Sequence, residues 1–222
     1  MQEKVLIVIP AFNEEKNIAK IVRETMKFGI VVVVDDASDD DTAKAAEEAG
    51  AVVLRQPVNM GVGFTTLTGV EYGIHRFKPD VIVTIDGDGQ HPPKFIPHLI
   101  KKIGEGYDVV FATRNLKRDD MPKIKRAGNS ILSKLLNILF SSNVSDTQTG
   151  FKAFTKSVYQ RICITSDGYE YCSEFIYEVV NKGISYTEID IPAIYDKNFK
   201  YKGTNVFTGL YILIRSIRFM LR

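Results

Sequence analysis

Two aspartates that flank a glycine, Asp86 and Asp88, follow an apolar segment at residues 81–85. A continuous apolar run of this kind predicts a buried strand, which places both carboxylates at its carboxyl end. Proteins commonly hold magnesium through one or two carboxylates together with the phosphate oxygens of a substrate. The spacing therefore predicts a site for a divalent cation and a diphosphate, to which Gln90 can add a neutral oxygen. A solvated turn that caps the next helix is the simpler alternative.

Other predicted strands also lead into polar residues. Four further apolar runs predict strands at residues 5–9, 31–34, 51–54 and 108–112. The segments that follow them are Pro10 to Glu14, Asp35 with Asp36, Asn59 to Gly63, and Arg114. Because ligands of parallel sheets bind at the carboxyl ends of the strands, we expect these segments to converge on one site.

The acidic pair Asp35 and Asp36 can accept hydrogen bonds from a nucleobase and from ribose hydroxyls. Helix capping at residues 42–49 is the alternative use of such residues. We expect both uses, with Asp35 and Asp36 on the ligand and with Asp40 and Thr42 at the start of the helix. For Phe12, packing beside the base and a place in the core remain equal alternatives.

The pattern of elements predicts the fold class. Helical periodicity at residues 14–28, 42–49, 63–77 and 93–104 alternates with the strands of the first half. This alternation predicts an α/β fold with a mainly parallel sheet that helices cover on both faces. In the second half we expect helices at 127–140, 172–182 and 206–222, strands at 152–155 and 186–191, and loops at 116–125 and 199–205. The chain shows no repeat or linker, so we expect a single domain of residues 1–222.

Composition narrows the functional class. The chain has 222 residues, of which 45% are apolar and 25% charged, with a net charge of +2. This balance is typical of a globular protein and does not indicate nucleic-acid binding. Cys163 and Cys172 lack the spacing of a metal site, and we expect reduced thiols in the cytoplasm. A strand begins almost at once and no apolar stretch approaches ~20 residues, so we expect neither a signal peptide nor a spanning helix.

Two predicted helices are amphipathic. The helix at 127–140 has an apolar stripe formed by Ile131, Leu132, Leu135, Leu136 and Leu139. The C-terminal helix is strongly apolar and carries Arg215, Arg218 and Arg222 at helical spacing. A basic, apolar helix of this kind suits an anionic lipid surface. Packing on the protein itself or on a partner helix is the alternative.

Six motifs together resemble the family 2 glycosyltransferases with the GT-A fold, and most closely the dolichyl (polyprenyl) phosphate sugar synthases. They are residues 9–14 (IPAFNE), 34–42 (VDDASDDDT), 59–63 (NMGVG), 86–92 (DGDGQHP), 112–114 (ATR) and 146–152 (DTQTGFK). The resemblance covers nearly the whole chain, and the motif at 86–92 is highly specific to the dolichyl-phosphate branch. It implies a Rossmann-like GT-A domain with a nucleotide-binding half at 1–115 and an acceptor-binding, membrane-facing half at 116–222.

The resemblance also implies roles for matching residues. Nucleotide contacts are implied for Pro10, Phe12, Glu14, Asp36 and Asp88, and ligands of Mg²⁺ or Mn²⁺ for Asp86, Asp88 and Gln90. Contacts with the lipid phosphate are implied for Arg114, Arg126 and Ser130, and the helix after Arg126 would rest on a membrane. Attachment would come from the amphipathic helices or from a membrane-anchoring partner. The sequence departs from the family at Lys200, Gly203, Asn205 and Val206, where relatives often carry Arg and then Gly-x-Ser-Lys in a closing loop.

The expected activity is inverting, metal-dependent transfer of a sugar from GDP-mannose, UDP-glucose or UDP-N-acetylglucosamine to dolichyl or polyprenyl phosphate. We expect it at the cytosolic face of a membrane. A phosphate monoester has a second pKa near ~6, so this acceptor needs no general base, and Asp146 would orient other groups or the metal shell. Direct roles in catalysis are expected for Asp88, Arg114 and Asp146. The alternative is a soluble family 2 enzyme that extends a glycan hydroxyl, for which Asp146, or less well Glu174, would be the base.

Two other classes fit the sequence less well. A sugar-phosphate nucleotidyltransferase would need a glycine-rich, arginine-bearing loop after the first strand, which residues 10–14 do not provide. A catalytically inactive scaffold is disfavoured because Asp86 and Asp88 are both present.

Overall fold

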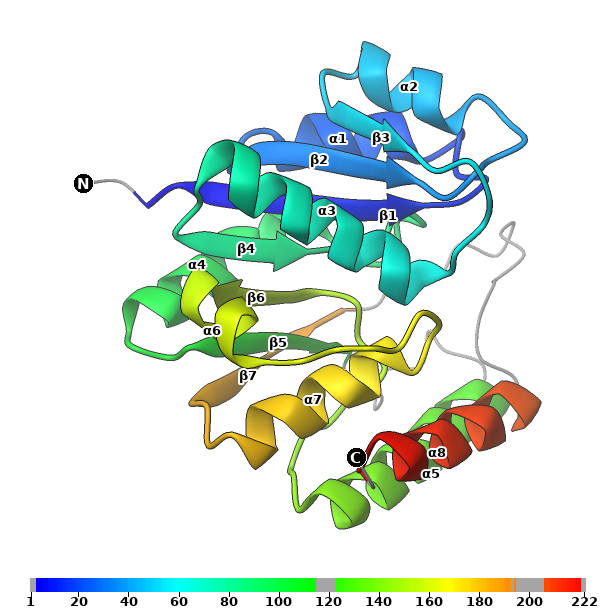
Figure 1. Ribbon diagram of the computed structural model, residues 1–222, viewed down its shortest axis with the longest axis vertical. Helices are drawn as coiled ribbons and strands as arrows, with labels where there is room; N and C mark the ends of the chain where they lie inside the picture. Colours follow the sequence, from blue (N-terminus) through cyan, green and yellow to red (C-terminus); the bar gives the residue numbers. More distant parts are fainter. Residues whose placement is uncertain (1–2, 115–122, 193, 195–205, 221–222) are drawn as a thin grey trace.

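Among the described residues, seven strands form one twisted sheet (Figure 1). The computed structural model of the protein describes residues 3–114, 123–192, 194 and 206–220, without the side chains of 123–127 and 206–207. The strands are β1 (Val5–Ala11), β2 (Ile30–Asp35), β3 (Val52–Arg55), β4 (Val81–Thr84), β5 (Val109–Arg114), β6 (Lys152–Thr155) and β7 (Tyr186–Ile191). Their order across the sheet is β3-β2-β1-β4-β6-β5-β7.

Parallel pairing dominates the sheet, as the sequence predicts. Strand β1 pairs in parallel with β2 and β4, β2 pairs in parallel with β3, and β5 pairs in parallel with β7. The exception is β6, which lies between β4 and β5 and runs antiparallel to both. The segment that leads into β6 therefore meets the carboxyl ends of β4 and β5.

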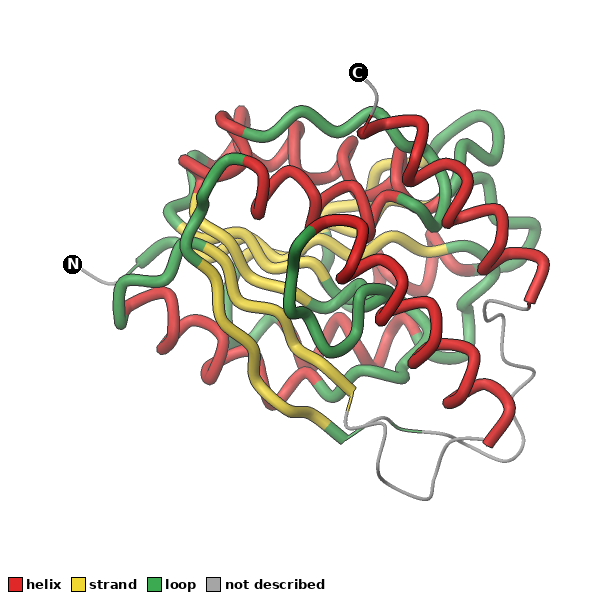
Figure 2. The backbone as a smooth tube through the Cα atoms, turned by 90° about the horizontal axis from the view of Figure 1, so that it is seen from below, coloured by secondary structure: helices red, strands yellow, loops and turns green. Residues whose placement is uncertain are grey.

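Helices cover both faces of the sheet (Figure 2). One face carries α1 (Ile18–Thr25), α2 (Thr42–Glu48), the short helix η1 (Pro93–Phe95) and α4 (Ile96–Gly104). The other carries α3 (Val62–Phe77), α6 (Lys156–Arg161) and α7 (Tyr171–Asn181). Successive strand residues point to opposite faces, so Ile7 and Ile9 belong to the first core layer while Leu6 and Val8 belong to the second.

Helices α5 (Lys123–Phe140) and α8 (Val206–Met220) lie side by side against α7 (Figure 1). Leu132 and Leu136 of α5 and Ile212 of α8 are buried in this contact. The ring of Phe219 on α8 lies 5.9 Å from the ring of Phe140 on α5. One face of α8 therefore packs on the protein, as one of the two alternatives predicts. No helix in the described part of the chain has the length and hydropathy that crossing a bilayer requires.

Several predicted boundaries are wrong. The helix predicted at 14–28 is shorter because residues 14–17 form a turn, in which the N–H groups of Asn17 and Ile18 donate to the carbonyl of Glu14. Helix α5 begins at Lys123, inside the segment predicted to be a loop. Helix α6 is missing from the prediction, because its six residues are too few to show a period. Residues 115–122 and 195–205, on which two loop predictions fall, lie outside the described residues.

Candidate active site

The turn after β4 holds the two aspartates of the predicted metal site. Asp88 accepts a hydrogen bond from the backbone N–H of Gln90 at 2.9 Å. Gly89 has a φ of 76°, a left-handed conformation that favours glycine. Gly150, just before β6, lies against the carboxylate of Asp86, since a Cβ on Gly150 would stand 2.2 Å from its Oδ1. The absence of a side chain at Gly150 therefore makes room for Asp86.

Neighbouring charges act differently on the two aspartates. Burial opposes ionisation of Asp86, but His91 and the cations of Lys152 and Arg114 outweigh it and hold the pKa of Asp86 below its usual value. The Nδ1 atom of His91 lies 3.3 Å from Oδ2 of Asp86. For Asp88, burial and then the charge of Asp86 raise the pKa above its usual value. The turn therefore concentrates negative charge that a cation would stabilise.

Arg114 ends β5 and is held by Asp146. Its Nε donates to Oδ2 of Asp146 at 2.6 Å, and one terminal nitrogen donates to Oδ1 at 3.1 Å. Oδ1 also accepts the backbone N–H of Gln148 at 3.2 Å. Burial opposes ionisation of Asp146, but Arg114 outweighs it and lowers the pKa of Asp146. Asp146 is therefore a weak base, and its bidentate bond fixes the plane of the Arg114 guanidinium.

Among the residues predicted to contact the nucleotide, Asp35 and Asp36 shape the backbone. Asp36 accepts the N–H groups of Met60 at 2.7 Å and of Gly61 at 3.0 Å. Asp35 is fully buried and accepts the N–H of Ser38 at 3.2 Å, with Nε of Arg55 at 3.3 Å. Neither carboxylate caps α2, because Asp40 accepts the N–H of Thr42 at the start of that helix. The predicted helix-start role of Asp40 and Thr42 is confirmed.

The segment after β1 lies beside this acidic pair. Pro10 is buried in β1, and its carbonyl oxygen would be 3.0 Å from a Cβ on Gly87. Glu14 is buried, and its N–H donates to Oγ1 of Thr42 at 2.7 Å. Phe12 is 38% exposed, so it does not belong to the core. Contact between Phe12 and a base stays a prediction.

The loop at 165–170 joins the start of α3 to the helices of the second half. The carbonyl of Asp167 accepts the N–H groups of Gly63 and Phe64 at the start of α3. A Cβ on Gly61 would stand 2.5 Å from the same oxygen. These glycines therefore make room for the backbone of the loop. Tyr169 is half exposed, and burial followed by the charges of Asp86 and Asp88 raises its pKa.

An ion-pair network ties this loop to α8. Arg215 donates from Nε to the fully buried Glu170 at 3.0 Å and from a terminal nitrogen to Asp167 at 3.3 Å. The cation of Arg215 thus binds protein carboxylates, which agrees with packing on the protein, one of the two alternatives for this helix. Arg218 is exposed, and Arg222 lies outside the described residues.

The remaining predicted site residues are less well placed. Gln90 stands in the metal turn, and its carbonyl accepts the N–H of Ile194. Ser130 is partly buried on α5, while the side chain of Arg126 lies outside the described residues, as do Lys200, Gly203 and Asn205. Sequence reasoning missed Lys152, which is buried beside Asp86. The available signal was a lysine inside an otherwise apolar strand at 151–154.

The donor atoms of the turn fit a hard divalent cation. Asp86 and Asp88 offer only oxygen, the side chain of Asp86 is 33% exposed, and Gly150 keeps space beside it. Mg²⁺ and Mn²⁺ prefer such oxygen donors, with waters and substrate phosphates as the other ligands. Within the described residues, no group of three or more His, Cys, Asp or Glu side chains is arranged to hold a metal ion.

Comparison with known proteins identifies the family of the chain and several relatives. The family described as Glycosyl transferase family 2 matches residues 6–163. A relative from Methanococcus voltae, named UDP-N-acetylglucosamine–dolichyl-phosphate N-acetylglucosaminyltransferase, is 31% identical over 97% of this chain and 96% of its own length. A relative from Haloferax volcanii, named dolichyl-phosphate hexose transferase, is 30% identical over 84% of this chain and 81% of its own.

A solved structure shares the fold. Glucosyl-3-phosphoglycerate synthase from Mycobacterium tuberculosis, crystallised with Mn²⁺, UDP and phosphoglyceric acid, superposes with a TM-score of 0.76 at 18% identity. The match covers 99% of this chain and 78% of that one. The α/β architecture predicted from the sequence is thereby confirmed.

Proposed function

Since the chain belongs to glycosyltransferase family 2, we propose that it transfers a sugar from a nucleotide-sugar to the phosphate of a dolichyl or polyprenyl lipid. One observation carries the proposal: Asp86 and Asp88 lie at the strand ends near an arginine, Arg114, that a buried carboxylate holds in place. The names of the two relatives support the lipid phosphate acceptor. The Mn²⁺ and UDP in the structure with the same fold support the donor half.

The residues of the chain divide the work. Asp86 and Asp88, with Gln90, would hold Mg²⁺ or Mn²⁺, which when bound neutralises the charge that builds on the departing nucleoside diphosphate. Arg114 would position the acceptor phosphate for in-line attack on the anomeric carbon, which inverts that centre. Pro10, Phe12, Glu14, Asp35 and Asp36 would surround the nucleoside, where Asp36 already fixes the loop at Met60 and Gly61.

The state of Asp146 favours a phosphate acceptor over a hydroxyl acceptor. A hydroxyl must lose a proton to a base during attack, whereas a phosphate monoester is already ionised at neutral pH. Asp146 has a lowered pKa and both of its oxygens accept hydrogen bonds. Glu174, the other candidate base, accepts hydrogen bonds from Thr165 and Ser166. Neither group suits proton abstraction, so the family 2 enzyme with a glycan hydroxyl acceptor is the weaker proposal.

Exposed apolar side chains on α5 and α8 support contact with a membrane. They are Ile131, Leu135 and Ile138 on α5, and Leu210, Ile214 and Ile217 on α8, and we call them the apolar platform. On each helix they recur at helical spacing, and Ile138 is 78% exposed. An apolar surface of this kind suits the headgroup region of a bilayer, where a polyprenyl phosphate presents its phosphate. We propose peripheral association through the platform.

The deciding experiment supplies Mn²⁺, dolichyl phosphate and a panel of UDP- and GDP-sugars, and detects glycolipid by mass spectrometry. A parallel reaction replaces the lipid with oligosaccharide acceptors. Glycolipid from at least one donor is the expected result. Transfer to oligosaccharides alone would establish the hydroxyl acceptor instead.

The variant Asp88→Asn provides the first residue-level check. We expect it to remain folded but to lose transfer by about 100-fold or more, because one carboxylate of the cation site is gone. Glu47→Gln, at an exposed carboxylate on α2, is the matched control and should retain activity. Undiminished transfer by Asp88→Asn would refute the role of the turn.

A further inference from the structure

Lys152 is a buried cation that the mechanism above does not use. Its side chain is 0% exposed, and its Nζ has no hydrogen-bond partner among the described residues. The Nζ lies 4.8 Å from the ring centroid of Tyr171 and 5.2 Å from that of Phe175. Lysines are almost never fully buried without a paired charge. Aromatic faces stabilise the ammonium only partly, so its charge must be balanced by carboxylates nearby.

The strand register places Lys152 beside the metal turn. Lys152 of β6 stands opposite Thr84 of β4, two residues before Asp86. The hydroxyl of Thr84 donates to the carbonyl of Gly150 at 2.7 Å, and Gly150 contacts the carboxylate of Asp86. The ammonium of Lys152 also helps to hold the pKa of Asp86 down. The register thus places Lys152 beside Asp86, and the effect of its charge on the pKa of Asp86 agrees with that placement.

The charges near the turn divide into two groups. Arg114 and Asp146 neutralise each other through a bidentate bond. Together with His91, whose Nδ1 lies 3.3 Å from Asp86, Lys152 is then a buried group that offsets part of the negative charge of the two aspartates of the turn. A divalent cation that enters by itself is repelled by Lys152 through a medium of low dielectric constant. A cation that enters with a diphosphate brings compensating negative charge, so the repulsion is offset.

We propose that Lys152 makes cation binding at Asp86 and Asp88 conditional on the nucleoside diphosphate. The inference rests on the proposed function, since it assumes that this turn holds the metal. In this arrangement the free protein binds Mn²⁺ weakly, and the cation and nucleotide strengthen each other's binding. The spent nucleoside diphosphate and its cation then leave together, which clears the site for the next donor.

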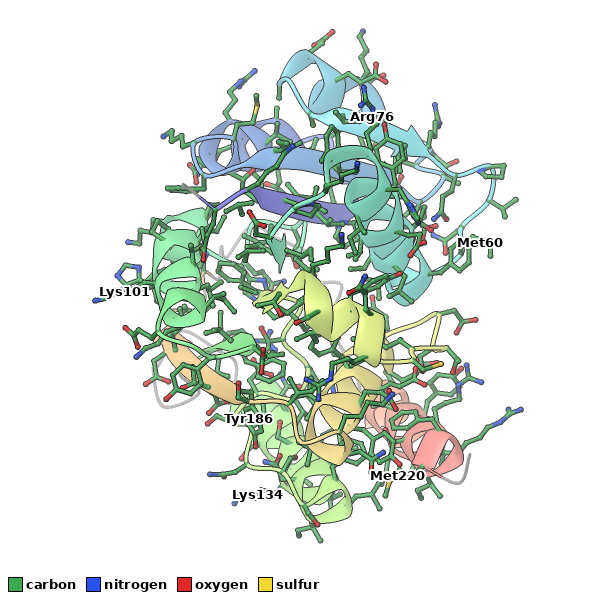
Figure 3. All side chains as sticks on the ribbon, turned by 60° about the vertical axis from the view of Figure 1, so that its left-hand side comes forward. Met60, Arg76, Lys101, Lys134, Tyr186 and Met220 are labelled. Atoms are coloured by element: carbon green, nitrogen blue, oxygen red, sulfur yellow. The ribbon has the colours of Figure 1, made fainter. Side chains whose placement is uncertain are left out.

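The test measures Mn²⁺ affinity by electron paramagnetic resonance, without nucleotide and with saturating UDP or GDP. It compares the wild-type protein with Lys152→Met, whose apolar chain of similar length suits the ring faces of Tyr171 and Phe175. Lys101→Met is the matched control, because Lys101 is exposed on α4 and its loss changes net charge equally (Figure 3). Lys152→Gln is a second neutral variant, and circular dichroism establishes which variants are folded.

The proposal for Lys152 predicts that loss of its charge increases the affinity for Mn²⁺. Lys152→Met should bind Mn²⁺ alone at least about 10-fold more tightly than the wild type, because the repulsion from one buried positive charge is removed. The factor by which nucleotide tightens Mn²⁺ binding should shrink by about 10-fold, and by reciprocity Mn²⁺ should strengthen nucleotide binding less. A role confined to packing would not tighten metal binding.

Three results would overturn the proposal. If a folded neutral variant of Lys152 binds Mn²⁺ alone no more tightly than Lys101→Met does, the proposed role of Lys152 is wrong. If the wild-type protein binds Mn²⁺ equally well with and without nucleotide, the proposed role of Lys152 is wrong, whichever variants fold. Wild-type protein that binds no Mn²⁺ even with UDP and GDP refutes the metal site itself, and thus the proposed function as well.

Discussion

The backbone at Gly150, just before β6, contacts the carboxylate of Asp86, which follows β4. We expect Gly150→Ala to abolish metal-dependent nucleotide binding, because the added Cβ would lie 2.2 Å from Oδ1 of Asp86 and must displace it. Calorimetric titration with UDP or GDP in the presence of Mn²⁺ measures the loss.

The control for this substitution is Gly104→Ala. A Cβ on Gly104 would meet no atom within 4 Å, and the residue ends α4 far from the turn in the sequence. It should bind nucleotide as the wild type does. Equal binding by both alanine variants would show that Asp86 does not depend on the space at Gly150.

Asp146 links the chemistry of the site to the stability of the fold. Asp146→Asn should lower the free energy of unfolding by about 3 kcal/mol at neutral pH, because it leaves the largely buried Arg114 without its paired charge. The folded-state pKa of Asp146 is lowered, so its contribution is complete above the ordinary aspartate pKa of about 3.9 and is lost as pH falls through the folded-state value.

The difference between wild type and Asp146→Asn should therefore narrow below about pH 4. Urea unfolding over a range of pH measures it, with the exposed Asp39→Asn as control. A difference that stays constant on acidification would contradict the assignment of the lowered pKa to the pair with Arg114.

At the scale of elements, the contact between α8 and the loop at 165–170 depends on one arginine. Arg215→Met should lower the free energy of unfolding by about 1–3 kcal/mol, because it leaves the buried carboxylate of Glu170 without its donor. Arg218→Met, at an exposed position of the same helix, should cause little change. Denaturant melts of both variants measure the effect, and equal stabilities would mean that the network contributes nothing.

The elements were predicted from sequence to differing degrees. Every strand of the sheet among the described residues was predicted, and the first five were predicted from apolar runs. Polar residues at the strand ends identified the turn of Asp86 and Asp88. The position of β6 between β4 and β5 was not predicted, because periodicity reports burial and not the neighbour of a strand. Since Gly150 and Lys152 reach the site through β6, their roles were hidden for the same reason.

Two ion pairs of the site and its surroundings were also not predicted from the sequence, because their partners are far apart in the chain. Asp146 and Arg114 are separated by 32 residues, and Arg215 and Glu170 by 45. Local patterns carry no information on such partners, so the sequence left lipid contact and packing on the protein as alternatives for the helix that carries Arg215. Phe12 and Asp35 were likewise ambiguous, since exposure depends on the whole fold.

At the scale of the whole molecule, the apolar platform defines one end. In Figure 3, Lys134 on α5 and Met220 on α8 mark this end, while Arg76 on α3 lies near the opposite one. The double variant Ile214→Gln with Ile217→Gln should reduce binding to anionic vesicles by about 10-fold, because two exposed apolar side chains no longer enter the lipid.

Flotation with phosphatidylserine-containing vesicles measures this binding. The control replaces two exposed apolar side chains elsewhere, Met26→Gln with Val58→Gln. Transfer to a short, water-soluble polyprenyl phosphate should survive in the platform variant. Equal vesicle binding by the platform and control variants would show that α5 and α8 do not meet the membrane.

The place of β6 between two strands that precede it in the chain governs how this protein can be assembled on the ribosome. Strands β4 and β5 are synthesised first, yet they cannot become neighbours, since β6 must lie between them. The nascent sheet therefore has an open seam until residue 155 has emerged, and a chain interrupted earlier exposes two unpaired edges. A protein divided into two fragments should therefore keep β4, β5 and β6 in the same fragment.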